Sequence, residues 1–539
     1  MTRATWLPLA CGVLLALVAF PPLLRLGFAT LSPAALAAVA TPIARAALVH
    51  SVAMGVVSTV LAAVLGTFFA VLLALTDMPG RRIVAFLFLL LLIVPPQITA
   101  QAWLVFVGPA SPLLGPLGLA PRSGSEPLYG PGGVAFLLAV EQAPIVYLAL
   151  RASLAAIPAD IVEAAQAAGA GRARQILLVL ELARPGLLGG LSLSFVAAIG
   201  NFGTPALLAI PGRYPMLTTL IYQRLTGFGI GSIGEAAALA LMLALLALAG
   251  ASVEALLLRR VATQAGQQVR IALGAWRRPA FALACVLLAL LLAAPLAALG
   301  LTSLLPALGV APRWATLELG NFRSVLDAGA TRRALLDSLA LSLGAGVVLA
   351  ALLIAVCHAA RRGRAARTLL AALEIPYVVP GLVLAIGCIL VFLRPVAGVA
   401  LYNTLGIIFA AYLARFPALA RRPLAAAMAA LDPALEEAAA SAGAGPLPRF
   451  VTVILPLALP AAVSAATLVF LAAFNELTVS ALLWSAGHET LGVGVFNLEQ
   501  AGEATRAAAL SVVAVAATVA LMLAAGTALR GRRLLPWQA

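Results

Sequence analysis

A series of long apolar stretches along the whole chain limits what this sequence can fold into. The hydrocarbon core of a bilayer is about 30 Å thick and is crossed by about 20 apolar residues in a helix. Stretches of this kind predict twelve spanning helices, at roughly residues 6–28, 48–75, 83–107, 131–150, 187–210, 235–258, 280–302, 337–358, 368–393, 398–414, 457–485 and 507–529. The sequence therefore predicts an all-α membrane protein.

The low content of charged residues excludes the main alternative classes. Charged residues make up 10% of the 539-residue chain and hydrophobic residues 63%, whereas a soluble domain has about 25% charged residues. Intrinsic disorder requires the opposite balance, with low hydrophobicity and high charge. A net charge of +15 would suggest nucleic-acid binding in a soluble protein. Here the 34 basic residues are all arginines that lie between apolar stretches, so membrane topology explains them better.

The arginines also predict the orientation of the chain. With the N-terminus inside and the spans alternating, about two thirds of the arginines fall on the cytoplasmic side, as the positive-inside rule requires. The long outside loop 303–336, which carries four arginines, is the exception. The apolar N-terminal segment is interpreted as a retained helix, because no small-residue cleavage site with a polar mature start follows it. We expect a bacterial inner-membrane protein with both termini in the cytoplasm.

An internal repeat divides the chain into two halves. One constant difference in residue number relates Glu163 to Glu437, Gly169 to Gly443, Asn201 to Asn475 and Thr204 to Thr478. Six spans in each half preserve the orientation of the next, so the halves form parallel repeats about an axis along the membrane normal. We assign residues 1–270 to the first six-helix repeat and residues 271–539 to the second.

The two longest cytoplasmic loops carry the clearest copies of this repeat. Each begins with a proline and an acidic residue, which suit the first turn of a helix. An alanine-rich stretch follows and predicts a short helix across the cytoplasmic end of the bundle. Gly169 and Gly443 then permit a sharp turn with positive φ. A surface of small side chains lets a partner approach closely, and two copies at one offset favour this interpretation over a plain helix-turn-helix.

These loops resemble the signature cytoplasmic loops of the permease subunits of ATP-binding-cassette (ABC) importers that are served by a substrate-binding protein. The second loop matches the pattern of that family closely, at Glu437, Gly443, Phe450, Val453, Leu455, Pro456 and Pro460. The first loop departs from it: it is one residue shorter, with Ile176 at the usual aromatic position and Glu181 where the proline of Leu-Pro would stand.

The resemblance implies that the loops, at about 155–186 and 429–460, form coupling helices that dock into cytoplasmic ATPase subunits. The residues it implies for this contact are Glu163, Ala164, Ala165, Gly169, Glu437, Ala438, Ala439 and Gly443. A periplasmic or lipoprotein binding protein would be the other partner. The chain has no lysine and hence no phosphate-binding loop. We therefore expect no catalytic residue and no cofactor in this chain, with ATP and Mg bound by two separate ATPase subunits.

Polar residues inside the fifth and eleventh predicted spans are candidates for a translocation path, because such residues are costly in lipid. They are Asn201, Phe202, Thr204, Asn475, Glu476 and Thr478. Hydrogen bonding between helices is the alternative role. Weaker candidates are Glu141 and Gln142, beside the helix-kinking Pro144. Proline-containing breaks are also predicted in two corresponding spans, at Pro95-Pro96-Gln97 and at Pro376 to Pro380, the second just after Glu374.

The solute is suggested by resemblance alone. Fused two-repeat permeases serve ferric iron, thiamine and some polyamine, phosphonate or anion systems. Residues 201–208, and Asn475-Glu476-Leu477-Thr478 with the later Thr490-Leu491, resemble the ferric-iron group. Ferric iron therefore ranks first, and thiamine, polyamine, phosphonate or another small solute follows. The four cysteines and three histidines are scattered without metal-ligand spacing, which suits a permease whose binding protein holds the metal.

An ion-coupled secondary transporter is the rival class of function. Such transporters also use repeats and broken helices. However, one would be expected to bury carboxylates or histidines along an ion route and to lack the paired loops. A membrane enzyme is disfavoured, because no catalytic motif can be assembled from the sequence.

Overall fold

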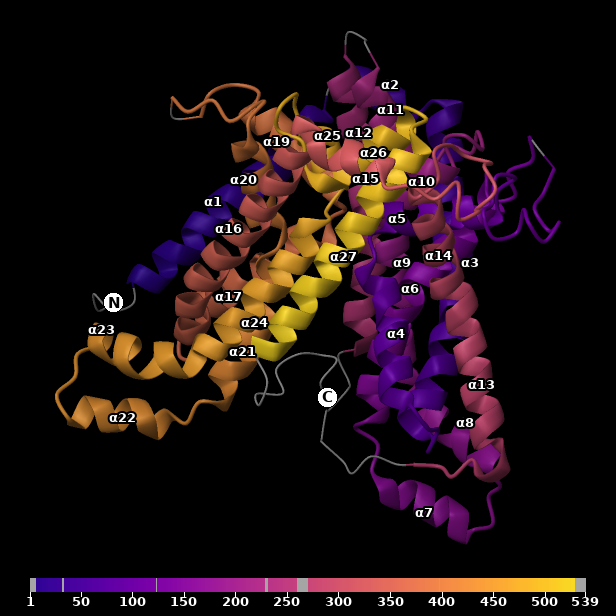
Figure 1. Ribbon diagram of the computed structural model, residues 1–539. Helices are drawn as coiled ribbons and strands as arrows, with labels where there is room; N and C mark the ends of the chain where they lie inside the picture. The colour runs from indigo at the N-terminus through magenta and orange to yellow at the C-terminus, as the bar shows by residue number, and fades with distance from the viewer. Residues whose placement is uncertain are drawn as a thin grey trace.

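The computed structural model describes residues 6–31, 33–122, 124–227, 231–258, 270–396 and 398–528. The regular structure of these residues is helical, apart from three isolated bridges. The helices form two bundles that diverge toward one end, where α7 (Ala159–Ala167) and α22 (Pro433–Ser441) lie well apart (Figure 1). The predicted all-α class is confirmed. Residues 1–5 and 529–539, which carry the termini, lie outside the described residues.

Eight helical segments among the described residues are long and apolar enough to cross a membrane, and three bent pairs raise the number to 11. The eight are α1 (Trp6–Ala29), α3–η2 (Pro42–Leu75), α6 (Pro131–Leu154), α12 (Ser232–Leu258), η3–α13–η4–α14 (Gly274–Ser303), α16 (Gly329–Ala360), α23–η5–α24 (Pro446–Phe474) and α27 (Ala504–Ala528). The predicted tenth span corresponds to the shorter helix α20 (Leu405–Arg415). The predicted number of twelve is therefore not confirmed.

Prolines break two corresponding spans, as predicted. α4 (Arg81–Ile93) meets α5 (Pro96–Val107) at 102°, and the segment α17–α18 (Arg364–Val378) meets α19 (Gly381–Phe392) at 104°. Val94 and Val379, which precede the prolines, are extended with ψ of 127° and 131°, because the proline ring disfavours the helical conformation before it. Gln97, the second residue of α5, and Gly381, the first residue of α19, are buried, so both half-helices begin inside the protein.

The helices repeat at the same offset that relates the sequence motifs. Residues 131 and 405 start α6 and α20, and the bounds of α7 and α22 coincide after this shift, as do those of α11 (Leu217–Thr226) and α26 (Leu491–Gln500). In the same way α9 (Arg184–Gly200) and α10 (Gly203–Leu208) correspond to α24 (Leu455–Phe474) and α25 (Ser480–Leu483). The assigned boundary at residue 270 adjoins residues 259–269, which lie outside the described residues. It stays a prediction.

The first spanning segment of each half packs against the other half. α1 lies against α16, α19 and α20, whereas α13 (Arg277–Leu288) and α14 (Ala294–Ser303) lie against α4 and α5 (Figure 1). One apolar core accordingly joins Phe88 and Tyr147 of the first half to Leu299 and Phe474 of the second. The remaining helices are α2 (Pro33–Val39), α8 (Arg172–Leu182), α15 (Gly320–Asp327) and α21 (Pro417–Ala430).

Candidate functional site

The short helices α7 and α22 end in the same kind of turn. Gly169 has a φ of 82° and Gly443 a φ of 83°, as the sequence predicts. The N–H of the residue after each glycine donates to a carbonyl five residues earlier, Ala170 to Ala165 at 2.9 Å and Ala444 to Ala439 at 3.0 Å. This hydrogen bond is typical of the Schellman motif, which a glycine in the left-handed region allows. The sequence thus builds the same rigid end on both helices.

The residues predicted to contact a partner are mostly exposed. The exposed side chains and glycines are Glu163, Ala164, Gly169, Glu437, Ala438 and Gly443, while Ala165 and Ala439 are half-buried. Within the described part of the chain, neither Glu163 nor Glu437 forms an ion pair. Each short helix therefore presents a surface of small side chains that includes at least one exposed carboxylate without an ion-pair partner among the described residues.

The two short helices are attached to the bundle by different chemistry. α7 is held by Val162, which belongs to the large apolar core that both halves share. The equivalent residue of α22 is Glu436, which is 5% exposed. Its carboxylate accepts a hydrogen bond from Arg361 at 2.7 Å and lies 3.8 Å from the imidazole of His358. Arg361 also donates to the carbonyl of Leu431 at 2.7 Å. This ion-pair anchor was missed in the sequence, although the arginine-rich end of α16 offered a signal.

The helices that follow the two loops also differ. The first loop continues through α8 into α9 with a bend of 63°, whereas the second continues from Pro446 to Phe474 as one segment that contains the π-helix η5. Phe450, at the usual aromatic position, lies 5.7 Å from His358 between ring centroids. Ile176 takes this position in the first loop and packs against the apolar core. The departures of the first loop from the family pattern thus coincide with a different path of the chain.

A buried polar cluster lies at the end of the fifth predicted span. Asn201 Nδ2 donates to Glu141 Oε2 at 2.7 Å, and Thr204 Oγ1 donates to Glu141 Oε1 at 2.5 Å. Phe202 is fully buried, with its ring 5.1 Å from that of Tyr222. The structure thus brings the three predicted residues of this half together. Glu141, which was a secondary candidate, joins Asn201 to Thr204.

The corresponding polar residues of the second half form a different network. Asn475 Nδ2 donates to Thr518 Oγ1 at 2.6 Å. Glu476 is buried, and its carboxylate accepts the N–H of Val479 at 2.8 Å, just before α25. Thr478 is half-buried beside them. Unlike Asn201, Asn475 therefore hydrogen-bonds to the last spanning helix of its half.

The half-helix α5 joins the two polar clusters. Gln97, at its start, donates to the carbonyl of Asn475 at 3.4 Å. One turn later, Gln101 donates to Glu499 at 2.8 Å and accepts from Ser511 at 2.6 Å. Gln101 and Glu499 were missed in the sequence, although a polar residue within the third predicted span was an available signal. These side chains are buried or half-buried, so their hydrogen bonds lie inside the protein.

A pair of opposite charges occupies equivalent positions around these clusters. Glu141 on α6 corresponds to Arg415 on α20 when the two repeats are aligned at their common offset. Arg415 donates to the carbonyl of Val379 at 3.3 Å and interacts electrostatically with Glu476. A Cβ atom at Gly381 would lie 2.8 Å from its guanidinium, so a larger residue at the start of α19 would displace the end of the Arg415 side chain.

Comparison with protein families gives two matches within this chain. Residues 62–263 and 342–531 each match the family described as binding-protein-dependent transport system inner membrane component. Each matched segment contains one of the short helices, α7 or α22, and one of the polar clusters.

Three relatives show the range of similar proteins. A probable ABC transporter permease of Sinorhizobium fredii is 28% identical over 499 residues, which cover 89% of this chain and 86% of the relative. A probable molybdenum ABC transporter permease of Haloferax volcanii is 33% identical over 203 residues, 37% of this chain and 72% of the relative. An Fe(3+)-transport system permease of Haemophilus influenzae is 35% identical over 139 residues, 25% of this chain and 27% of the relative.

Proposed function

This chain belongs to the family of binding-protein-dependent transport system inner membrane components, and on that premise we propose that it is the membrane-spanning subunit of an ATP-driven importer. In this proposal, a binding protein delivers the solute at one face and two ATPase subunits dock at the other. We place α7 and α22 in the cytoplasm, because the arginine bias of the sequence assigns their loops to that side.

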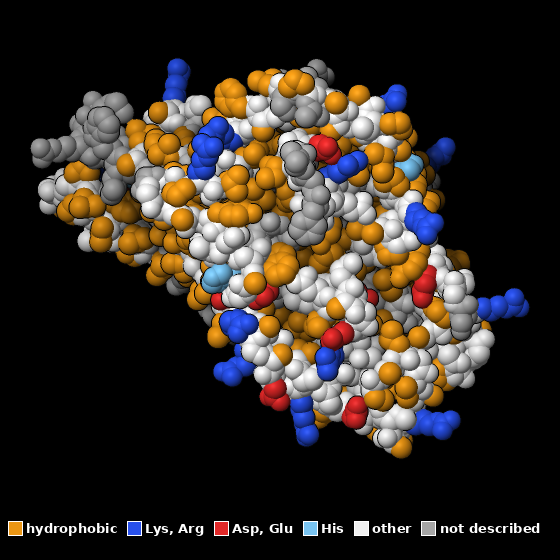
Figure 2. All heavy atoms as spheres, turned by 90° about the horizontal axis from the view of Figure 1, so that it is seen from above, with side chains coloured by type: hydrophobic (Ala, Val, Ile, Leu, Met, Phe, Trp, Pro, Cys, Tyr) orange, Lys and Arg blue, Asp and Glu red, His pale blue; other side chains and the backbone are white. Residues whose placement is uncertain are grey.

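The observation that carries the coupling role is the pair of exposed helices α7 and α22, with coincident bounds and the same terminal turn. Partner subunits related by symmetry would meet equivalent surfaces on the two helices. ATP-driven closure of the ATPase dimer would then move α7 and α22 together. The opposite face of the protein presents both basic and acidic side chains (Figure 2). A face of mixed charge suits a polar and reversible contact with a binding protein.

The motion at α7 has a short route to the buried clusters. α6 ends at Leu154, only a few residues before α7 begins at Ala159. The same helix carries Glu141, which is hydrogen-bonded to Asn201 at the end of α9. A displacement of α7 would thus pull on both ends of this hydrogen bond, through α6 on one side and through α8 and α9 on the other. Opening of the region around Asn201 and Asn475 would let the solute pass.

Ferric iron is the solute that we propose first. Glu141, Glu476 and Glu499 place three carboxylates in buried or half-buried positions around the polar clusters, against one nearby cation, Arg415, which interacts with Glu476. A path lined by carboxylates favours a cation and repels an oxyanion such as molybdate or phosphonate. The resemblance of residues 201–208 to the ferric-iron group and the Fe(3+)-transport relative support this order. Thiamine and polyamines, which are also cations, follow.

The coupling role is tested in the complex assembled with its ATPase subunits. Gly443→Trp and Glu437→Lys should abolish stimulation of ATP hydrolysis by the loaded binding protein and weaken co-purification of the ATPase. Gly309→Trp is the matched control, since Gly309 also has positive φ and open space around it but lies on an outer loop. It should leave co-purification unchanged. Normal stimulation in both α22 variants would refute the docking assignment.

The solute is tested independently. The binding protein that serves the proposed importer is purified as isolated from cells, and its bound ligand is identified by mass spectrometry and metal analysis. Uptake of ferric iron and of molybdate is then compared in proteoliposomes that contain the complete importer. Bound iron and iron uptake support the proposal, whereas uptake of molybdate alone would overturn it.

A further inference from the structure

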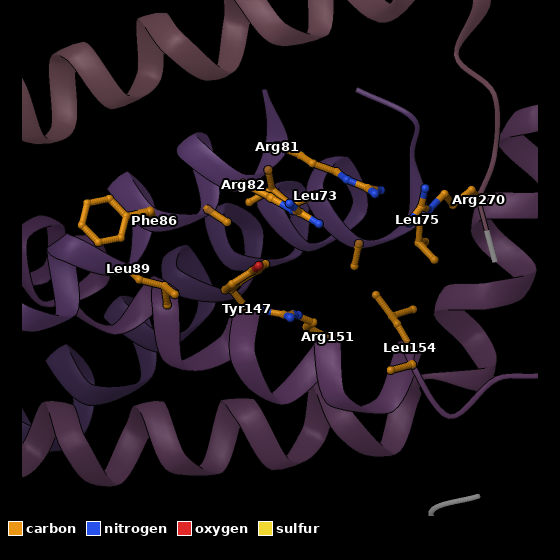
Figure 3. Close-up of a pocket in the computed structure, with 13 residues that line it drawn as sticks. Leu73, Leu75, Arg81, Arg82, Phe86, Leu89, Tyr147, Arg151, Leu154 and Arg270 are labelled. Atoms are coloured by element: carbon orange, nitrogen blue, oxygen red, sulfur yellow. The ribbon is translucent and has the colours of Figure 1, made fainter. Parts of the chain in front are cut away.

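A cavity of about 250 Å³ lies at the end of the first half that carries α7. Four arginines line it, and their side chains converge on it from several segments (Figure 3). Arg81 and Arg82 lie on one side, Arg151 faces them, and Arg270 lies near one end. The remaining lining residues are Leu73, Ala74, Leu75, Ala85, Phe86, Leu89, Tyr147, Leu154 and Ala155.

The fold fixes this convergence through the backbone. Arg81 is the first residue of α4, after Gly80 with a φ of 66°. Arg151 lies in the last turn of α6. Arg270 precedes Ile271, whose N–H donates to the carbonyl of Leu75 at 2.7 Å. The N-terminus of α4, which is the positive end of its helix dipole, adds to the positive potential of these arginines.

None of the four arginines has a carboxylate partner among the described residues. The acidic residue near this segment, Asp77, is already engaged by Arg277 at 3.4 Å and by the N–H of Leu273 at 2.9 Å. Like charges held around one cavity destabilise the fold unless an anion neutralises them. The positive-inside rule requires only that arginines lie on the cytoplasmic side, and arginines scattered over the same loops would meet it. It does not explain why four of them converge on one cavity.

The cavity selects a small oxyanion. Its volume lies below the range of about 300–1,000 Å³ that is usual for small-molecule pockets, so it suits one phosphate-sized group. Guanidinium groups bind phosphate oxygens through paired, charge-assisted hydrogen bonds. Phe86 and Leu89 make part of the wall apolar, which leaves room for a group that is attached to a lipid.

We propose that this cavity is a binding site for a phosphate-class anion, carried by an anionic lipid headgroup or present as the free ion. The bound anion holds the segment that begins at Arg270 against the first half. That segment contacts the α7–α8 region, because Arg172 at the start of α8 donates to the carbonyl of Leu273 at 3.4 Å. Occupancy of the site therefore stiffens the base of α7 and regulates how far it moves.

The site is tested on the purified full-length chain in lipid nanodiscs. The double variant Arg82→Gln and Arg151→Gln removes two of the cavity arginines. The double variant Arg364→Gln and Arg367→Gln is the matched control, because it removes the same charge from exposed positions of α17 in the second half. Thermal unfolding and binding of inorganic phosphate are measured in zwitterionic nanodiscs, and unfolding is repeated in nanodiscs with phosphatidylglycerol.

We expect the wild type and the control to be stabilised by one of the two anions, and the cavity variant to lose roughly tenfold or more in apparent affinity. Without added phosphate or phosphatidylglycerol, the cavity variant should unfold at an equal or higher temperature than the wild type, because the repulsion between the arginines is reduced. A response to phosphate identifies a free-ion site, and a response to phosphatidylglycerol alone identifies a headgroup site. No response of the wild type to either anion, or an equal response of the cavity variant, would overturn the proposal.

Discussion

Glu141 and Arg415 occupy equivalent positions in the two halves and carry opposite charges. Glu141 accepts hydrogen bonds from Asn201 and Thr204, whereas Arg415 interacts with Glu476, which stands where the first half has Phe202. Each half thus has one buried acid in its polar cluster, on α6 in the first half and in the link between α24 and α25 in the second. The two halves therefore share their backbone arrangement but differ in the positions of their buried charges.

The first prediction concerns the carboxylate of Glu141. Glu141→Leu should destabilise the protein by about 1–3 kcal/mol, because it leaves the buried amide of Asn201 without its acceptor and the hydroxyl of Thr204 with only the carbonyl of Pro96, at 3.4 Å. Glu141→Gln keeps an acceptor and removes the charge, so it should fold normally and lower uptake of a cation. Thermal unfolding and uptake in proteoliposomes separate the two effects. Full uptake by a well-folded Glu141→Gln chain would show that the charge has no part in transport.

The second prediction concerns the cluster of the second half. Asn475→Leu removes the hydrogen bond to Thr518, and Glu476→Gln removes a buried charge while retaining one acceptor for the N–H groups before α25. Both changes should lower uptake and leave assembly with the ATPase intact. Uptake per assembled complex is the measurement. Thr467→Val on α24 is the control, since Thr467 is half-buried and its hydroxyl donates only within its own helix, to the carbonyl of Val463.

The third prediction concerns the anchor of α22. Glu436→Ala leaves Arg361 without its carboxylate, although Arg361 keeps its hydrogen bond to the carbonyl of Leu431. Because Arg361 is partly exposed, the expected cost is about 1–3 kcal/mol. We expect faster amide exchange in α22 and weaker ATPase co-purification. The equivalent change in the first half, Val162→Ala, removes only apolar contact and should loosen α7 less. Equal amide exchange rates of α22 in the wild type and in Glu436→Ala would show that Glu436 does not anchor this helix.

The fourth prediction concerns close packing of two spanning helices. A Cβ atom at Gly66 in α3 would lie 2.6 Å from the carbonyl oxygen of Ala143 in α6. Gly66→Ala should therefore lower stability by about 1–3 kcal/mol through overpacking. Gly300→Ala in α14 is the control, because nothing lies within 4 Å of its Cβ position; it should be neutral or slightly stabilising. Unfolding midpoints of the purified chains decide the comparison.

The sequence predicts elements that depend on local chemistry. Pro95 and Pro380 break their helices for a reason that acts within two residues. Gly169 and Gly443 turn the chain because only glycine adopts their backbone conformation without strain. The constant offset between the repeats then transfers each local feature from one half to the other.

Other features depend on contacts that no local pattern contains. The short helices α10, α11, α25 and α26 are shorter than the window of about 20 residues that was used to find spanning helices. The same window overestimated the tenth predicted span, which is the shorter helix α20. The packing of α1 against the second half is invisible to periodicity, because a membrane helix is apolar on every face. Glu436 and Gln101 gain their roles only from partners distant in the sequence, Arg361 and Glu499.

The exchange of first helices between the halves has a consequence for how such a protein can be made and inherited. If the gene were cut between the repeats, each product would leave a groove that the other product's first helix fills. In a pair of identical products, each groove would face a first helix from the same half instead of the helix that it packs against here. Fusion into one reading frame therefore guarantees a one-to-one stoichiometry of two unlike halves, and mutations can accumulate in either half without generating a competing homodimer.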